Sequence, residues 1–291
     1  MDRPVSASSS SPAAVRLNAF TVDVEDYFHV AALASAISRD SWPQREYRVE
    51  RSTECLLELL AERGVHGTFF VLGWVAERSP GLVRTIAAAG HEVACHGYSH
   101  ELIYRQSRQE FRDEAARAKG LLEDAIGQPV LGYRAASFSV VRETLWALDE
   151  LIDLGFRYDS SIFAIRHDRY GIPDASPLPG RVTAPSGRSI LEFPMAPANF
   201  FGLKIPVTGG GYFRIFPYRL TLAGLRRINA AGRPFAFYLH PWEIDPGQPR
   251  VRVGTLSRFR HYTNLARCGE RLRHLLREFE FGPMGQVLQS I

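Results

Sequence analysis

The stretch "HEVACHGYSH" (residues 91–100) joins a short apolar run to two histidines, His96 and His100, that are four residues apart. The run 91–95 is typical of a buried strand. Side chains at this spacing lie on one face of a helical turn, so both imidazoles could reach one Zn²⁺ through bonds of about 2.0–2.1 Å. On its own, a pair of histidines at this spacing more often arises by chance, in a core or on a surface, than as a metal site. A carboxylate from a neighbouring strand end would complete a catalytic metal set.

Six further apolar runs have the length of a strand, and helical stretches lie between most of them. One of these begins at Ser52 or Thr53 as its N-cap, carries a leucine stripe, and ends before Gly64. Glycines also follow the later helical stretches, as expected for a left-handed residue that closes a helix. The seven predicted strands cover 17–24, 67–73, 91–95, 130–134, 156–160, 189–194 and 235–240.

Alternating strands and helices predict a parallel sheet with helices outside, because parallel strands need long crossovers. Seven strands without a dinucleotide-binding fingerprint favour a distorted (β/α)7 barrel over an open sheet. We expect the Pro- and Gly-rich segment 160–188 to pass over the barrel mouth. A single domain is predicted over 17–291, with a C-terminal helix at 262–281, after a disordered tail at 1–16.

Bulk composition excludes several classes of protein. The chain is 45% hydrophobic and 23% charged, with a net charge of +4, which is ordinary for a globular protein and gives no clustered basic face for nucleic acid. It has no 18-residue apolar run, and its first 20 residues do not resemble a secretory signal, so we expect none. Cys55, Cys95 and Cys268 are too scattered for a disulfide framework, so we expect reduced, buried thiols and a cytoplasmic location. Peripheral contact with the inner membrane face and a dimeric state are left open.

Polar residues follow the predicted strands at the edge where a (β/α) barrel builds its site. The acids after the first strand, Asp23, Glu25 and Asp26, would repel one another if buried without a nearby cation. Flanking apolar residues favour a partly buried site over a solvated turn. The candidates at the later strand ends are His96, His100, Arg134, Asp159 and His240.

In this order, the motifs resemble the polysaccharide deacetylase family with the NodB homology domain, carbohydrate esterase family 4. The resemblance covers roughly residues 17–243. Two further stretches, "PVTGGGYFRIFPYRL" (206–220) and "FAFYLHPWEID" (235–245), resemble a subfamily associated with bacterial exopolysaccharide loci. The five matching motifs are "TVDVED" (21–26), "HGYSH" (96–100), "GYRAASF" (132–138), "RYDSS" (157–161) and "YLHP" (238–241).

The resemblance implies a divalent metal, with Zn²⁺ the expected ion, held by His96, His100 and a carboxylate. The usual first motif has adjacent acids, whereas Val24 here separates Asp23 from Glu25. Strand alternation puts Asp23 and Glu25 on one face. Asp23 is therefore the expected base and Glu25 the expected ligand, with Asp26 the close rival.

For the remaining motifs, the resemblance implies that Arg134 keeps Asp23 ionised and oriented. His240 would be the general acid, and Asp159 would hold it in the right tautomer. The aromatic residues near the mouth could stack on sugar faces or belong to the core: Tyr27, Phe28, Tyr212, Phe213 and Trp242. The glycine-rich "GGGYF" (209–213) lacks the ending of a phosphate-binding loop, and we interpret it as a tight turn that shapes the substrate cleft.

The implied reaction removes N-acetyl groups from amino-sugar residues of an exopolysaccharide or adhesin precursor. A cytoplasmic enzyme cannot reach an exported polymer, so the expected substrate is an N-acetylated oligosaccharide or a lipid-linked glycan precursor. Two alternatives stay open. One is a metal-independent, allantoinase-like amide hydrolase, and the other is a carbohydrate-binding pseudoenzyme that uses the barrel mouth as a scaffold.

Overall fold

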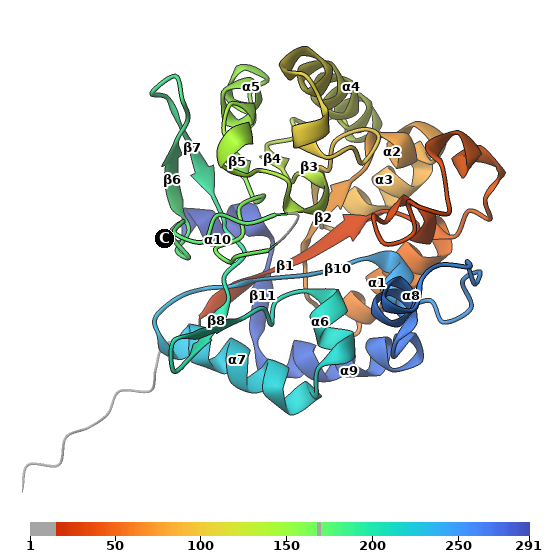
Figure 1. Cartoon of the computed structure of the whole chain (residues 1–291), viewed down its shortest axis with the longest axis vertical. Coiled ribbons are helices and arrows are strands. Elements are labelled where there is room, and N and C mark those ends of the chain that lie inside the picture. Colours follow the sequence, from red (N-terminus) through yellow and green to blue (C-terminus); the bar gives the residue numbers. More distant parts are fainter. Residues whose placement is uncertain (1–15, 168–169) are drawn as a thin grey trace, which may run out of the picture.

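The computed structural model describes residues 16–167 and 170–291 (Figure 1). Its centre is a sheet in the order β10-β1-β2-β3-β4-β5-β7-β6, in which neighbouring strands from β10 to β7 are parallel and β6 runs antiparallel to β7. The strands are β1 (Leu17–Val24), β2 (Thr68–Val71), β3 (Glu92–Cys95), β4 (Gly132–Tyr133), β5 (Tyr158–Asp159), β6 (Gly180–Thr183), β7 (Ser189–Glu192) and β10 (Ala236–Leu239).

All seven predicted strands are present, and the chain has the expected distorted (β/α)7 barrel fold. β11 (Glu280–Gly282) was not predicted, and it pairs with the first residues of β1. β8 (Ala198–Phe200) and β9 (Leu203–Ile205) form a separate hairpin beside α7. The predicted tail lies outside the described residues, apart from Arg16.

Helices surround the sheet on its outer side (Figure 1). They are α1 (Val49–Ala61), α2 (Gly73–Arg78), α3 (Pro80–Ala88), α4 (Arg108–Ile126), α5 (Ala147–Asp153), α6 (Gly210–Ile215), α7 (Tyr218–Ala230), α8 (Thr255–Tyr262), α9 (Leu265–Glu278) and α10 (Met284–Gln289). Short 3₁₀ turns are η1 (Tyr27–His29), η2 (Arg39–Gln44), η3 (Ile103–Arg105), η4 (Ala136–Phe138), η5 (Arg142–Thr144) and η6 (Pro241–Ile244).

The first residue of a helix is set by local sequence signals in α4 and by tertiary contacts in α1. α4 begins with the capping box of Ser107 and Glu110, and Gly127 closes it with a φ of +67°. The predicted N-cap of α1 at Ser52 or Thr53 is wrong, because the helix begins at Val49. A carboxylate distant in sequence, Asp26, accepts from the first free backbone N–H groups and replaces a local cap.

Alternation along β1 separates the outer core from the barrel interior. Phe20, Val22 and Val24 pack against the helices. Ala19 belongs to the interior cluster, and Asp23, two full pleats further on, also faces inward into a cavity. One apolar strand therefore brings a carboxylate to the barrel mouth.

Within the segment 160–188, Gly180–Thr183 form β6, whose hairpin with β7 extends the sheet edge. The predicted C-terminal helix corresponds to α9, and its predicted inward residues Leu265, Leu272, Leu275 and Leu276 are all buried. All three cysteines are free. Cys95 and Cys268 are buried as expected, but Cys55 is exposed because it lies on the outer face of α1. Among the helices of the described ranges, none has the length and apolarity needed to cross a membrane.

Candidate active site

The carboxyl ends of β1, β3 and β10 meet at one side of the barrel, as the strand-end pattern predicts. There they surround a cavity of about 170 Å³. A second cavity of about 190 Å³ adjoins it, since Ala31 and His100 line both. The first cavity is lined by Asp23, Glu25, Val30, Ala31, His96, His100, Ser137, Phe138, Tyr170, Tyr238, His240 and Trp242.

Glu25, His96 and His100 form a buried cluster whose potential ligand atoms all lie within 4.8 Å of one another. His96 Nδ1 donates to the carbonyl of Arg134 at 2.8 Å, which leaves Nε2 free to bind a metal. His100 Nε2 lies 3.0 Å from Glu25 Oε2. In the described part of the chain, that buried oxygen has no aligned hydrogen-bond donor. Two imidazoles and a carboxylate fit a catalytic Zn²⁺ site with open positions.

The two histidines meet through a loop and not, as predicted, through a helical turn. β3 ends at Cys95, and residues 96–100 are not helical. Gly97 has a φ of +72° and His100 a φ of +52°, so the chain bends back until the two rings lie 5.4 Å apart. A non-glycine residue in this region is strained, and such strain is concentrated at functional sites.

Asp26 does not belong to this cluster, which favours Glu25 over its rival as the carboxylate ligand. Its Oδ1 accepts from the N–H of Tyr27 at 2.8 Å, and its Oδ2 accepts from those of Arg48 and Val49 at 2.6 and 2.8 Å. Burial raises the pKa of Asp26 to about 6, although these backbone donors oppose the shift. The carboxylate ties the end of β1 to the start of α1.

Asp23 and Arg134 form an ion pair inside the barrel. Arg134 Nη1 donates to Asp23 Oδ1 at 2.6 Å and also to Thr21 Oγ1 at 2.9 Å. Its Nη2 and Nε donate to the Oγ and carbonyl of Ser160 at 3.1 and 3.2 Å. The guanidinium is therefore fixed, as the predicted role of Arg134 requires. Asp23 Oδ2 lies 3.9 Å from His240 Nε2.

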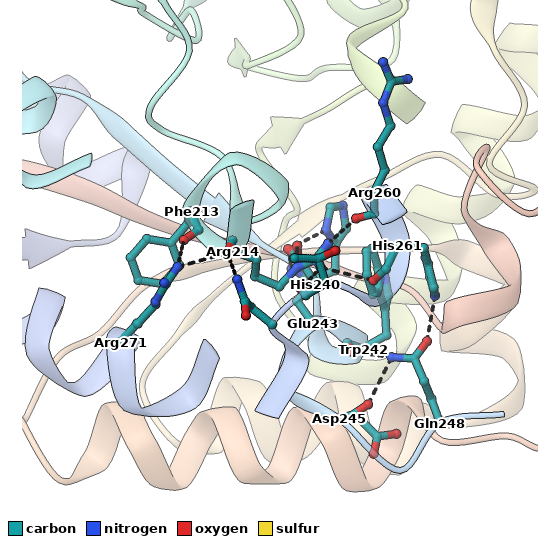
Figure 2. Close-up of polar contacts among 12 residues, drawn as sticks. Phe213, Arg214, His240, Trp242, Glu243, Asp245, Gln248, Arg260, His261 and Arg271 are labelled. Carbon is teal, nitrogen blue, oxygen red and sulfur yellow. Dashed lines mark hydrogen bonds and ion pairs between the residues drawn. The ribbon is translucent and has the colours of Figure 1, made fainter. Parts of the chain in front are cut away.

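His240 has a carboxylate at each ring nitrogen, and Figure 2 shows the one that Glu243 supplies. Nδ1 lies 3.0 Å from Glu243 Oε2, and Nε2 lies 3.4 Å from Glu25 Oε1. Burial alone lowers the pKa of His240, but Glu25, Glu243 and Asp23 outweigh it and raise the pKa to about 9. The ring stacks on Trp242 with centroids 5.1 Å apart.

Asp159 does not hold His240, so this predicted role is wrong. Asp159 Oδ1 accepts from Ser161 Oγ at 2.5 Å, and its partner across the sheet is Glu192 on β7. Burial raises the pKa of Asp159 to about 6. The residue missed by sequence reasoning is Glu243, for which the signal was the acid three residues after the histidine in "HPWE" (240–243).

Some of the predicted aromatic residues belong to the core, and others lie where they could stack on a sugar. Tyr27, Phe28 and Phe213 are buried in the core, whereas Trp242 lines the cavity. Tyr212 does not line the cavity, but its hydroxyl is 3.2 Å from that of Tyr170, which does. Phe138, Tyr170 and Tyr238 were not predicted, yet they line the cavity beside Trp242.

Together, the sheet order and this rim define a NodB-type (β/α)7 barrel protein. Residues 36–158 match the polysaccharide deacetylase family, and residues 160–289 match a domain of unknown function, DUF3473. One part of the chain is therefore similar to the polysaccharide deacetylase family and the part after it to DUF3473, in agreement with the resemblance. His96, His100 and Arg134 lie in the first match, whereas His240 lies in the second. Membership of an exopolysaccharide-locus subfamily stays a prediction.

Curated relatives are similar over part of the chain. A peptidoglycan-N-acetylglucosamine deacetylase of Bacillus cereus is 28% identical over 116 residues, which are 40% of this chain and 40% of that protein. A chitooligosaccharide deacetylase of Bradyrhizobium sp. is 31% identical over 99 residues, 34% of this chain and 43% of that protein. The chain therefore spans about two fifths of the length of these relatives.

A crystal structure of a proposed polysaccharide deacetylase from Mycobacterium smegmatis has the same fold throughout. Its TM-score is 0.64 at 21% identity, over 99% of this chain and 94% of that one. A pseudoenzyme of carbohydrate esterase family 4 from Bacillus anthracis has a TM-score of 0.50 at 16% identity, over 95% and 66%. Because the same fold occurs in a protein described as a deacetylase and in one described as a pseudoenzyme, the fold does not establish activity, which has to be argued from the site residues.

Proposed function

We propose that the chain is a metal-dependent hydrolase that removes N-acetyl groups from amino-sugar residues of a glycan. One observation carries this proposal. A cluster suited to a divalent cation lies in the same cavity as a carboxylate, Asp23, and an imidazole, His240, that could exchange protons with a substrate. The two groups are 3.9 Å apart, which suits a base and an acid acting on one small acyl group.

Glu25, His96 and His100 would hold the ion, and Zn²⁺ is the expected one because two imidazoles and a carboxylate are a common catalytic zinc set. When bound, the ion supplies Lewis acidity that polarises the acyl oxygen. The hydrogen bond from His96 Nδ1 to a backbone carbonyl fixes the tautomer in which Nε2 faces the cluster. Burial lowers the pKa of His96 to about 4, so the ring is neutral and able to bind a cation.

Asp23 would accept a proton from the attacking water, since one carboxylate oxygen is bound by Arg134 and the other lies toward His240. His240 Nε2 would then donate a proton to the departing nitrogen as the C–N bond breaks. Acetate and a free amine leave, and one water is consumed. General acid catalysis of this kind contributes roughly 10²–10⁴-fold in rate.

Two observations support a glycan as the substrate. The relatives are named for peptidoglycan N-acetylglucosamine and for chitooligosaccharide. The site cavity also shares two lining residues, Ala31 and His100, with the neighbouring cavity, where further sugars of a glycan chain could bind. Phe138, Tyr170 and Trp242 offer flat aromatic walls of the kind that pack against sugar rings.

The finer substrate belongs to the same proposal. We expect a cytoplasmic N-acetylated oligosaccharide or lipid-linked precursor of an exopolysaccharide, and the three free cysteines agree with a reducing compartment. Contact with the inner membrane face would follow from a lipid-linked substrate. Fractionation of cells carrying the full-length tagged protein tests the location, and recovery outside the cytoplasm would refute it.

The decisive experiment measures acetate release from N-acetylhexosamine oligosaccharides and from lipid-linked sugars, with and without a chelator. Metal-dependent release supports the proposal. Release that a chelator leaves unchanged would favour the metal-independent amide hydrolase. Unchanged sugar after long incubation with metal-loaded protein would favour the carbohydrate-binding pseudoenzyme.

A further inference from the structure

A second buried ion pair lies directly behind His240 (Figure 2). Glu243 Oε2 accepts from the backbone N–H of His240 at 3.1 Å and lies 3.0 Å from its Nδ1. Glu243 Oε1 accepts from Arg214 Nε at 2.7 Å. Both carboxylate oxygens are therefore engaged, one by the catalytic candidate and one by a guanidinium. Neither Glu243 nor Arg214 is exposed by more than 1%.

Arg214 is itself held in place by the backbone around it. Its Nη1 donates to the carbonyls of His261 and Thr263 at 3.1 and 2.7 Å, and its Nη2 donates to that of Arg260 at 3.0 Å. The guanidinium also lies 5.3 Å from the Trp242 ring centre. Because these hydrogen bonds fix the planar guanidinium of Arg214, its Nε points in one direction. The carboxylate of Glu243, which accepts from Nε, is therefore fixed as well.

The glycine-rich stretch 209–213 makes room for this carboxylate. A Cβ on Gly210 would lie 1.8 Å from Glu243 Oε2, which is far inside contact distance. A Cβ on Gly211, the next residue of α6, would meet nothing within 4 Å. Neither glycine has a positive φ, so the need for glycine at position 210 is one of space and not of backbone conformation. The predicted tight turn is the start of a helix in this structure.

We infer that Glu243 is a positioning residue for His240, oriented by Arg214 and admitted by Gly210. This inference rests on the proposed function. All three residues lie in the segment that matches the domain of unknown function, residues 160–289. The inference means that residues of this segment hold the general acid His240 in place, a role that the sequence analysis predicted for Asp159.

The carboxylate of Glu243 determines the direction of the His240 ring. A carboxylate at Nδ1 keeps the proton there in the neutral imidazole and fixes the ring, so Nε2 is directed at the cavity. The Nδ1 contact and the opposite placement of Nε2, 3.9 Å from Asp23 Oδ2, agree with this. Without the carboxylate, the ring is free to turn, and the proton on Nε2 is no longer presented to the leaving nitrogen.

Two substrates separate this role from a merely structural one. Cleavage of an N-acetyl amide needs a proton on the leaving nitrogen. Cleavage of 4-nitrophenyl acetate releases a phenolate that leaves without one, while both reactions consume one water. A positioning residue that acts through the general acid therefore affects the amide far more than the aryl ester. General damage to the fold or to the ion site affects both.

The variants are Glu243→Gln and Gly210→Ala, with Gly211→Ala as the matched control. In Glu243→Gln the amide NH₂ must face either Arg214 or His240, both of which donate. We expect kcat on N-acetylglucosamine oligomers to fall about 10²-fold, with KM changed less than about twofold. Aryl acetate turnover should change by less than about threefold. Gly210→Ala should show the same split, and Gly211→Ala should match wild type.

Equal losses on amide and ester, or no loss in either variant, overturn the inference. If Glu243→Gln does not fold, Gly210→Ala still decides, because it displaces the carboxylate without removing it. If the wild-type protein releases no acetate from any glycan, the proposed function fails separately. Crystal structures of wild type and Glu243→Gln then judge the inference, and an unchanged His240 ring would overturn it.

Discussion

Arg134 binds one oxygen of Asp23 and leaves the other available. Nη1 donates to Oδ1 at 2.6 Å, while Oδ2 lies 3.9 Å from His240 Nε2. Because Thr21 and Ser160 engage the other guanidinium donors, the pair cannot rotate as a unit without breaking several bonds. A buried carboxylate is thereby held in one orientation, with one oxygen directed toward His240.

Asp23→Asn should abolish most acetate release while leaving the fold intact. The amide keeps an acceptor for Arg134 but cannot take a proton from water, so we expect a rate loss of about 10²–10⁴-fold. Metal content by atomic emission and the melting temperature should stay close to wild type. Near-normal turnover in this variant would show that Asp23 is not the base.

Arg134→Met should lower stability strongly, because it leaves the Asp23 charge buried without its partner. Breaking a buried pair from one side costs about 3–5 kcal/mol in the free energy of unfolding. Urea denaturation measures this loss. Arg226→Met, which breaks an exposed pair with Glu278, is the control and should change stability little. Similar small losses in both variants would contradict the structural role of Arg134.

Glu25→Gln and Asp26→Asn should separate a ligand from a structural acid. We expect Glu25→Gln to lose bound metal and activity, since Glu25 lies with both histidines in the cluster. Asp26→Asn should keep the metal but unfold more easily by about 1–3 kcal/mol, because the amide cannot accept all three backbone donors. Metal loss in Asp26→Asn but not in Glu25→Gln would reverse the assignment.

The buried acids Asp159 and Glu192 predict a loss of stability as pH rises. Burial raises the pKa of Asp159 to about 6, and burial and the neighbouring acid raise the pKa of Glu192 well above its usual value. The folded state therefore binds protons more tightly than the unfolded chain. The contribution to the free energy of unfolding is complete below about pH 4 and is lost as pH rises through about 6 and above.

Glu192→Gln removes one of these titrations and should reduce the fall in stability between pH 5 and pH 8. Denaturant unfolding at both pH values measures the fall. Glu54→Gln, on the exposed side of α1, is the control and should behave as wild type. An equal fall in Glu192→Gln and wild type would mean that the pair does not share a proton in the folded state.

The site residues that could be predicted from the sequence are those that lie on a strand or directly after its end. Alternation in "TVDV" (21–24) puts Asp23 inside the barrel, and strand ends deliver Glu25, His96 and His240 to the same edge. These placements depend on a period of two and on parallel topology, both of which can be inferred from the pattern of apolar runs. The end of α4 at Gly127 is equally local, and it agrees with the prediction that glycines follow the later helical stretches.

What escaped prediction depends on contacts between distant segments. Asp26 caps α1 across 22 residues, and nothing near Val49 signals it. Glu243, which contacts His240, is held by Arg214 on α6. Glu243 fits there only because residue 210 is a glycine, and this need for space cannot be inferred from the sequence. The bend of "HGYSH" (96–100) likewise follows from positive φ values and not from its helical spacing.

The most direct test loads the purified protein with Zn²⁺ and follows acetate release from N-acetylglucosamine oligomers before and after chelation. We expect release that a chelator abolishes and added Zn²⁺ restores, and no release from Asp23→Asn under any of these conditions. Release that persists at full rate in the metal-free protein, or no release from any N-acetylated glycan by the metal-loaded protein, would contradict it.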